Sequence, residues 1–254
     1  MSVNRRKFLA LTSAAAALGL STKGLELVAS GEAQGSVDKS QVRWAMVIDL
    51  NKFMNNPHLM QKCIDACVEV HNIPKIENEN HKIKWIWTEP YNHAFIEQEN
   101  DQLPEEIENF PVLLLCNHCD RPPCTDVCPT KATWRRDSDG VVMMDWHRCI
   151  GCRYCMAACP YGSRSFNWSD PRPDIENMHA EYPTRTKGVV EKCTFCDERL
   201  ARGQIPACVE VSEGALVFGN LNDPLSPVRR ILKNRFSLRR KPELGTHPEI
   251  YYIL

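Results

Sequence analysis

The stretch from Arg148 to Phe166 reads RCIGCRYCMAACPYGSRSF and places four cysteines within eleven residues. Their spacing is C-x2-C-x2-C-x3-C, and Pro160 follows the last one. Disulfides between such close neighbours would close very short loops and contribute little stability. The spacing therefore indicates a metal-binding run. Its cysteines are Cys149, Cys152, Cys155 and Cys159.

This spacing is that of the ligand run of bacterial ferredoxins, in which three close thiolates bind one [4Fe-4S] cluster and the fourth reaches a second cluster. Pro160 removes a backbone donor after the fourth cysteine and so ends the helical turn. The run consequently predicts two neighbouring clusters that share their ligands crosswise.

A second run precedes it and has a similar form. The stretch CNHCDRPPCTDVCPTKA, residues 116–132, has the spacing C-x2-C-x4-C-x3-C, again followed by proline. Between the two runs, ATWRRDSDGVVMMD places an Asp139-Gly140 turn between two strand-like segments, as a ferredoxin hairpin requires. Crossed ligation then predicts two complete ligand sets. Cluster A would be bound by Cys116, Cys119, Cys124 and Cys159. Cluster B would be bound by Cys149, Cys152, Cys155 and Cys128.

A third run is incomplete, and so is its partner upstream. The spacing C-x2-C-x11-C ends before Ser212, where a fourth cysteine is expected. Upstream, Cys63 and Cys67 keep the terminal x3 spacing, but the residues available before them, Phe53, Pro57 and Met60, cannot replace a thiolate. One cluster of this pair is therefore predicted to be absent. The other, cluster C, would be bound by Cys193, Cys196, Cys208 and Cys67. Three [4Fe-4S] clusters thus use twelve of the 13 cysteines and leave Cys63 over.

Zinc is the main alternative to iron-sulfur clusters. It suits the third run better than the two complete ones, because structural zinc sites usually combine separate C-x2-C pairs. Disulfides cannot pair an odd number of cysteines completely. We expect His118 to be a neighbour of a cluster rather than a ligand, since its run already supplies four thiolates. We expect Cys63 to be a small buried hydrophobic residue.

The amino terminus has the pattern of an export signal. Arg5 and Arg6 precede an apolar run from Phe8 to Leu20, which is shorter than the about 20 residues of a membrane-spanning helix. We therefore expect residues 1–35 to be a twin-arginine signal peptide and the protein to be periplasmic. The formal net charge of -1 gives no indication of nucleic-acid binding.

These runs, together with EKCTFCDERLARGQIPACVE at residues 191–210, resemble the four-cluster ferredoxin-type electron-transfer subunits of membrane oxidoreductases, such as those for polysulfide, dimethyl sulfoxide and nitrite. The resemblance implies a loop-rich α+β fold of two ferredoxin-like halves of βαββαβ type, one inserted in the other. Residues 116–184 would form the inserted half with two clusters. Residues 36–115 and 185–254 would form the outer half, with one retained cluster and a carboxyl-terminal docking tail.

The resemblance also implies a function and partners. The chain would be an electron-transfer subunit without its own substrate site, and we find no catalytic motif in it. It would pass single electrons between a periplasmic multihaem cytochrome c subunit and a polysulfide-reductase-type integral membrane subunit that interacts with quinone. It would be attached through these partners to the outer face of the cytoplasmic membrane.

Within the family, VIDLNKF, KWIWTE and RRKPELGTHPEIYYIL are similar to the exported iron-sulfur subunit of a membrane complex associated with dissimilatory sulfite and sulfur metabolism, whose further subunits would also be partners. Service to a molybdopterin oxidoreductase is the alternative. A metal-stabilised interaction module without a redox role is the competing class of function.

Charged residues suggest further roles. Residues 229–241 contain seven bases and no acid, and we expect them either to dock a partner or to be solvated surface. The acidic run 97–108 is expected to be solvated. Because ligands are spread from Cys67 to Cys208, we expect little continuous core and a strong dependence of folding on the clusters. We also expect several cations near the ligands to offset cluster charge, and these are Arg121, Lys131, Arg148, Arg153, Lys192 and Arg199.

Overall fold

The computed structural model of the protein describes residues 42–98 and 100–254. The predicted signal peptide, residues 1–35, lies outside this part of the chain. No helix within the described residues combines the length and the apolar character needed to cross a membrane.

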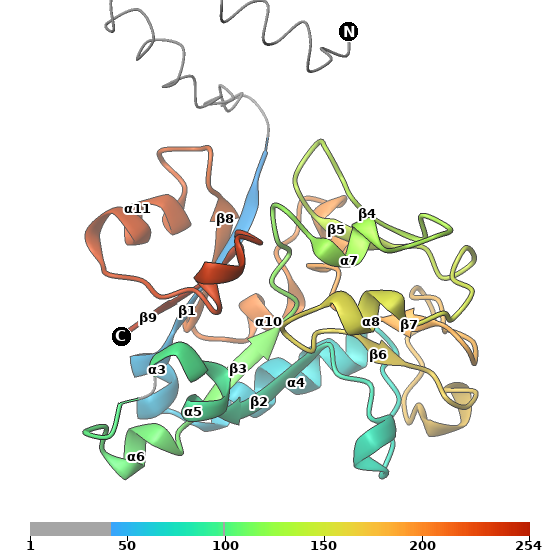
Figure 1. The fold of residues 1–254 in the computed structure, drawn as a ribbon, viewed down its shortest axis with the longest axis horizontal. Helices are drawn as coiled ribbons and strands as arrows, with labels where there is room; N and C mark the ends of the chain where they lie inside the picture. The colour runs from blue at the N-terminus through green and yellow to red at the C-terminus, as the bar shows by residue number, and fades with distance from the viewer. Residues whose placement is uncertain (1–41, 99) are drawn as a thin grey trace, which may run out of the picture. The chain divides into compact units, whose positions relative to one another are not determined.

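A three-stranded sheet with the order β8-β1-β9 forms one side of this part (Figure 1). The central strand β1 (Trp44–Asp49) runs antiparallel to β8 (Leu216–Asn220) and parallel to β9 (Ile250–Ile253). The residues of β1 from Ala45 to Ile48 are fully buried because both faces of the sheet are covered. Ala45 and Val47 pack with Val228 of helix α11 (Pro227–Asn234), and the alternate residues of β1 face the main core.

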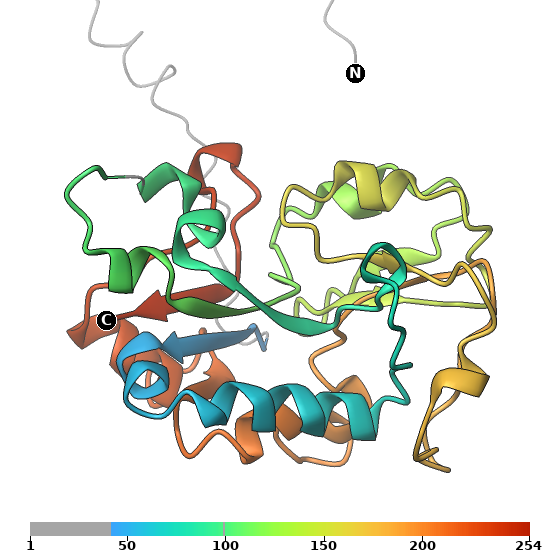
Figure 2. The same cartoon turned by 90° about the horizontal axis from the view of Figure 1, so that it is seen from below.

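A two-stranded sheet and a long helix lie next to this sheet. Strand β2 (Ile86–Pro90) pairs antiparallel with β3 (Pro111–Leu115). After α3 (Leu50–Asn55), whose first turn is capped by the Asp49 carboxylate, α4 (His58–Val70) runs along the sheets (Figure 2). Its buried residues recur at helical spacing, so that one face of α4 points into the core. They are Leu59, Met60, Cys63 and Cys67.

The two complete cysteine runs lie together on the other side of this part, where α7 (Pro123–Asp126) and α8 (Tyr154–Ala158) are neighbours (Figure 1). Strands β4 (Thr133–Arg135) and β5 (Val142–Met144) pair antiparallel, which confirms the predicted hairpin. Strands β6 (Ser165–Phe166) and β7 (Val190–Glu191) form another short pair. The remaining short elements are η1 (Glu79–His81), α5 (Tyr91–Ala94), η2 (Ile96–Gln98), α6 (Glu105–Glu108), η3 (Arg172–Asp174), α9 (Asp197–Leu200), α10 (Ala207–Glu210) and η4 (Pro242–Leu244).

This mixture of helices and small sheets confirms the α+β class. The arrangement in two ferredoxin-like halves, with boundaries at residues 36–115, 116–184 and 185–254, stays a prediction. The expectation of little continuous core was wrong. Side chains of β1, α4, β2 and β3 form one continuous hydrophobic core, because both sheets and the helix bury apolar faces against each other.

The basic run 229–241 is divided between core and surface. Ile231 and Leu232 pack against the residues that cover the outer face of β1, so α11 is held by the chain's own sheet. Phe236, directly after the helix, is 84% exposed. Its exposed ring leaves an apolar contact point on this basic segment.

Candidate iron-sulfur cluster sites

The four cysteines predicted for cluster A line one cavity, although they come from segments far apart in the sequence. Cys116 and Cys119 lie in the loop after β3, Cys124 lies in α7, and Cys159 follows α8. The first three of these thiols are buried. We call this group site A. Cys159, the predicted crossed ligand, comes from the second run and lines the same cavity.

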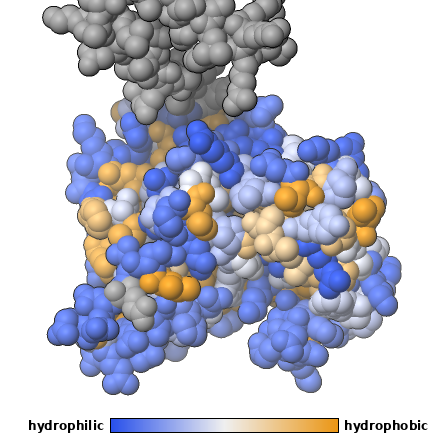
Figure 3. Space-filling model, in the orientation of Figure 1, coloured by the Kyte–Doolittle hydropathy of each residue, from blue (hydrophilic) through white to orange (hydrophobic). Residues whose placement is uncertain are grey.

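The four cysteines predicted for cluster B line a second cavity, site B, and they are Cys128, Cys149, Cys152 and Cys155. Burial raises the pKa of the Cys128 thiol, but backbone N–H groups of Thr133, Ala132 and Thr130 outweigh it and lower the pKa below its ordinary value. Cys152 is exposed, as are the side chains of Ile150 and Tyr154 beside it. Hydrophobic side chains lie on this face, over α7 and α8 (Figure 3). Site B thus has an exposed thiol, whereas in site A only Cys159 is partly exposed.

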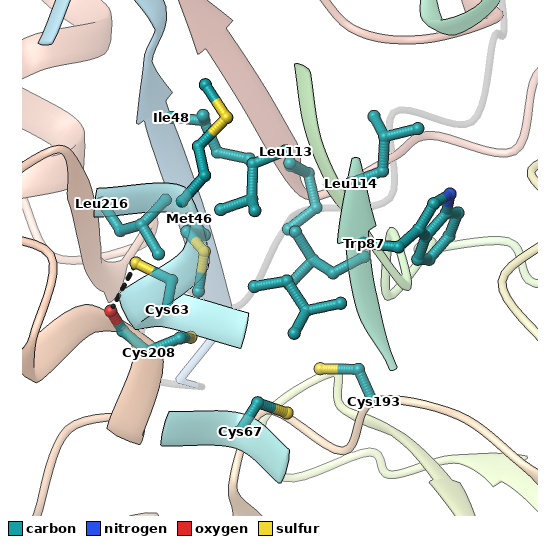
Figure 4. Close-up of a cluster of buried hydrophobic side chains, with 14 of the residues drawn as sticks. Met46, Ile48, Cys63, Cys67, Trp87, Leu113, Leu114, Cys193, Cys208 and Leu216 are labelled. Carbon is teal, nitrogen blue, oxygen red and sulfur yellow. Dashed lines mark hydrogen bonds between the residues drawn. The ribbon is translucent and has the colours of Figure 1, made fainter. Parts of the chain in front are cut away.

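The third group, site C, lies between α4 and the loop after β7. The thiols of Cys193, Cys196 and Cys208 lie close enough to Cys67 to act on its charge, and Figure 4 shows the sulfurs of Cys67 and Cys193 pointing toward each other. Burial raises the pKa of the Cys193 thiol to about 12. The backbone N–H groups of Phe195 and Ala207 donate to Cys193 Sγ and Cys196 Sγ, both at 3.4 Å. N–H donors to sulfur are a feature of iron-sulfur sites, where they help set the reduction potential.

Left-handed backbone conformations let each of the three runs fold around its thiols. His118, Arg153, Phe195 and Cys196 all have positive φ angles. Gly151 has a φ of +69°, and a Cβ atom there would clash with the Gly188 carbonyl oxygen. Such conformations are costly for residues with side chains, so their presence in all three runs indicates a backbone shaped for a bound group.

The region where the absent fourth cluster would have bound, around Cys63 and Ser212, is filled by packed side chains, and we call it the closed fourth site. Met60 and Cys63 lie on the continuous helix α4, and the Cys63 thiol donates to the Cys208 carbonyl oxygen at 3.3 Å among hydrophobic side chains (Figure 4). Ser212 Oγ donates to the Val209 carbonyl oxygen and accepts from the Leu216 N–H. Burial raises the pKa of the Cys63 thiol to about 12. Cys63 is therefore a neutral core residue, as the sequence predicted.

His118 lies between sites A and C. Its ring stacks on Phe195 with centroids 3.7 Å apart, and its Nδ1 accepts a hydrogen bond from the Val142 N–H at 3.1 Å. Burial lowers the pKa of His118 well below its ordinary value, so the ring is neutral. It joins the loops of the two sites.

Two features of the sites were not predicted from the sequence. Arg164 Nη2 donates to Cys124 Sγ at 2.9 Å, although no motif distinguishes this arginine from the others. Near site C, His71 Nδ1 lies 3.5 Å from Cys67 Sγ, and its Nε2 lies 3.1 Å from Glu198 Oε1. His71, Glu198 and Cys196 offer ligand atoms within 4.8 Å of one another. This polar group lies directly beside site C.

The six cations predicted to offset cluster charge differ in their surroundings. Lys192 is fully buried. Arg121, Lys131, Arg148 and Arg153 are exposed, and Arg199 pairs with Glu210. Water screens exposed charges strongly, so among these six only Lys192 lies where its charge acts at full strength.

The residues present fit [4Fe-4S] clusters, because each site gathers four thiols and buried N–H groups or a cation point at several of the sulfurs. The individual ligand assignments and the number of three clusters stay predictions. Sites of this kind define the class of ferredoxin-type electron-transfer proteins.

Comparisons with known proteins agree with this class. The family model of the 4Fe-4S dicluster domain matches residues 108–173. The Hdr-like menaquinol oxidoreductase iron-sulfur subunit 1 of Archaeoglobus fulgidus is 38% identical, over 98% of this chain and 97% of its own length. The menaquinone reductase iron-sulfur cluster-binding subunit of Nitratidesulfovibrio vulgaris is 33% identical, over 86% and 91%. A subunit of the tetrathionate reductase of Salmonella typhimurium is 36% identical, over 93% and 84%.

The chain belongs to the family of 4Fe-4S ferredoxin-type iron-sulfur subunits of menaquinol and molybdopterin oxidoreductases. It is an electron-transfer subunit of such a complex and not its catalytic subunit.

Proposed function

We propose that this protein is the periplasmic iron-sulfur subunit of a membrane-bound respiratory complex of the DsrMKJOP type, in the position of the DsrO subunit. It passes single electrons through three [4Fe-4S] clusters, between a multihaem cytochrome c subunit and a quinone-interacting membrane subunit of the polysulfide-reductase type. The complex serves dissimilatory sulfite or sulfur metabolism.

The observation that carries this proposal is the row of three thiol groups. Arg164 donates to Cys124 Sγ of site A and to Thr133 Oγ1, which lines site B, and His118 of the site A loop stacks on Phe195 of the site C loop. The order B, A, C follows, with site A in the middle. A row of this kind suits electron transfer, whereas an interaction module held by metal would not need neighbouring sites.

Each cluster, when bound, supplies a one-electron redox centre. The residues of the chain supply the ligands, the hydrogen bonds to sulfur and the surroundings of each cluster. The chain's thiolates would hold the iron, and the N–H groups of Phe195 and Ala207, which donate to Cys193 Sγ and Cys196 Sγ, would influence the potential. The four cysteines of site C are buried away from water, and the exposed edge of site B at Cys152 offers an electron entry or exit point.

Two relatives carry menaquinol or menaquinone in their names, which supports a quinone-linked complex. The closed fourth site supports a partner other than a molybdopterin subunit, because in the family the missing cluster would lie at the soluble-partner end. Service to a molybdopterin oxidoreductase is the second candidate, and it is favoured by relatives named for tetrathionate, selenate and arsenate reductases.

Iron and acid-labile sulfide, measured on anaerobically purified protein together with EPR of the reduced sample, test the cluster content. Three [4Fe-4S] clusters give about 12 of each per chain and coupled signals. About 8 of each, with one zinc per chain, would instead make site C a structural zinc site and shorten the row to two clusters.

The location and the partners need a separate test. Replacing Arg5 and Arg6 by lysine should retain the protein in the cytoplasm, and the wild type should co-purify from membranes with a haem-staining subunit. Co-purification with a molybdenum-containing subunit would support the second candidate and contradict the first.

A further inference from the structure

Two cations are buried among the cysteines of the three sites. The side chain of Lys192 is fully buried, and Arg164 is only 5% exposed. Lysine and arginine are almost never buried without a charged partner, because removing the charge from water is costly. Their hydrogen-bond partners here are the Cys124 thiol, the Thr133 hydroxyl, the Met144 thioether and two carbonyl groups, none of which is a carboxylate. The compensating negative charge must therefore come from the sites themselves.

Arg164 lies between sites A and B. Its Nη2 donates to Cys124 Sγ of site A and to Thr133 Oγ1, both at 2.9 Å. Thr133 lines the cavity of site B, and so does Met144, whose sulfur lies 3.8 Å from Arg164 Nη1. One guanidinium therefore lies against two different sites.

Lys192 lies between sites A and C. Its Nζ donates to the Val142 and Cys193 carbonyl oxygens, which fix the ammonium group in place. Val142 lines the cavity of site A, and Cys193 is one of the cysteines of site C, so the ammonium group lies at the junction of these two sites. The stacked rings of His118 and Phe195 join the loops of the same two sites.

We propose that Arg164 and Lys192 are fixed counter-charges at the two junctions of the row, and that together they make the central cluster A the first to be reduced. This inference rests on the proposed function. A reduced cluster carries one more negative charge, and a nearby cation in a buried site stabilises that charge strongly. Arg164 acts on clusters B and A, and Lys192 acts on clusters A and C. Only cluster A has both cations as neighbours.

Redox titration followed by EPR tests the proposal on variants of the intact protein. In Arg164→Gln we expect the midpoint potentials of clusters A and B to become more negative, while cluster C keeps its value. In Lys192→Met we expect A and C to shift in the same direction, while B keeps its value. The charge-conserving variants Arg164→Lys and Lys192→Arg should shift less. Arg148→Gln, which removes an exposed arginine beside site B, is the matched control and should change no potential.

A neutral variant with full iron content and unchanged potentials would overturn the proposal, and so would a uniform shift of all three clusters.

The wild type gives a second measurement that does not depend on folding of a variant. If cluster A is reduced first, the second electron must enter B or C, and both are neighbours of A. The EPR spectrum should therefore show spin coupling as soon as two electrons are bound per chain. Two uncoupled signals at two electrons per chain would contradict the inference. The iron and sulfide assay distinguishes this failure from failure of the proposed function, since only the latter changes the number of clusters.

Discussion

Site C and the closed fourth site share helix α4 yet differ in almost every physical respect. Cys67 and Cys63 lie one helical turn apart, and both are buried. Around Cys67, thiols from a loop with two left-handed residues converge. Around Cys63, helix α4 is regular from His58 onward, and residues 57–63 contain no positive φ angle.

We interpret this difference as the absence of the loop that would surround a cluster, and not only of its ligands. Once cysteines no longer hold a left-handed loop in place, the chain is free to form the helix that its sequence favours, and that helix gains buried contacts at Leu59 and Met60. The four variants below test this interpretation, beginning with the largest expected effect.

Cys67→Ala should remove cluster C. We expect iron and sulfide to fall from about 12 to about 8 per chain, because one of four thiolates is lost. The apparent melting temperature should fall as well, since cluster binding contributes to folding. Iron analysis and thermal unfolding under anaerobic conditions measure both. Retention of all iron would show that Cys67 is not a ligand.

Ser212→Ala should destabilise the fold without loss of iron. The change removes the acceptor of the Leu216 N–H, and a buried donor without a partner costs about 1–3 kcal/mol. The melting temperature should then fall by about 2–4 °C per kcal/mol. Ser138→Ala, at an exposed serine, is the control and should leave it unchanged. A fall in iron content would place Ser212 at a cluster.

Cys63→Ala should have a smaller effect. Removing one buried sulfur atom costs about 1 kcal/mol, and iron content should stay at the wild-type value. The contrast with Cys67→Ala, one turn away on the same helix, separates a core residue from a ligand. Equal loss of iron in both variants would contradict that separation.

The combined variant Pro57→Cys, Met60→Cys and Ser212→Cys restores the cysteine spacing and should still bind no fourth cluster. Met60 and Cys63 are buried in the hydrophobic core, so a cube bound there would have to displace packed side chains. Iron should remain at about 12 per chain after reconstitution with iron and sulfide. A rise to about 16 would mean that the ligands alone determine the backbone.

The cysteines that the sequence grouped for clusters A and B line common cavities, because ligand spacing is a local property, whereas their ligation stays a prediction. The sequence also predicted the β4-β5 hairpin, since turn residues lie between two short apolar strands. It could not identify Arg164 as buried, because burial depends on segments far away in the chain. The same holds for Arg185 and Glu191, a buried ion pair at 2.7 Å whose arginine lies beside Trp85 and Trp146.

Pairing in the β8-β1-β9 sheet was equally hidden, since nothing near β1 indicates a parallel partner at residues 250–253. The expectation of little core failed for the same reason. The apolar residues lie in short segments between loops, and they form one core only because strands distant in the sequence pair with each other. Hydrophobic periodicity within a short window does not predict such long-range pairing.

The position of β1 in that sheet bears on how the chain matures. β1 is synthesised first, but both strands that pair with it are synthesised after all three cysteine runs. A nascent chain can therefore expose every thiol needed for cluster assembly while β1 still presents an unpaired apolar edge, which chaperones recognise and other chains can pair with. The sheet cannot close before β9 is synthesised, so a chain interrupted upstream of residue 250 would still expose this edge and remain recognisable as unfinished.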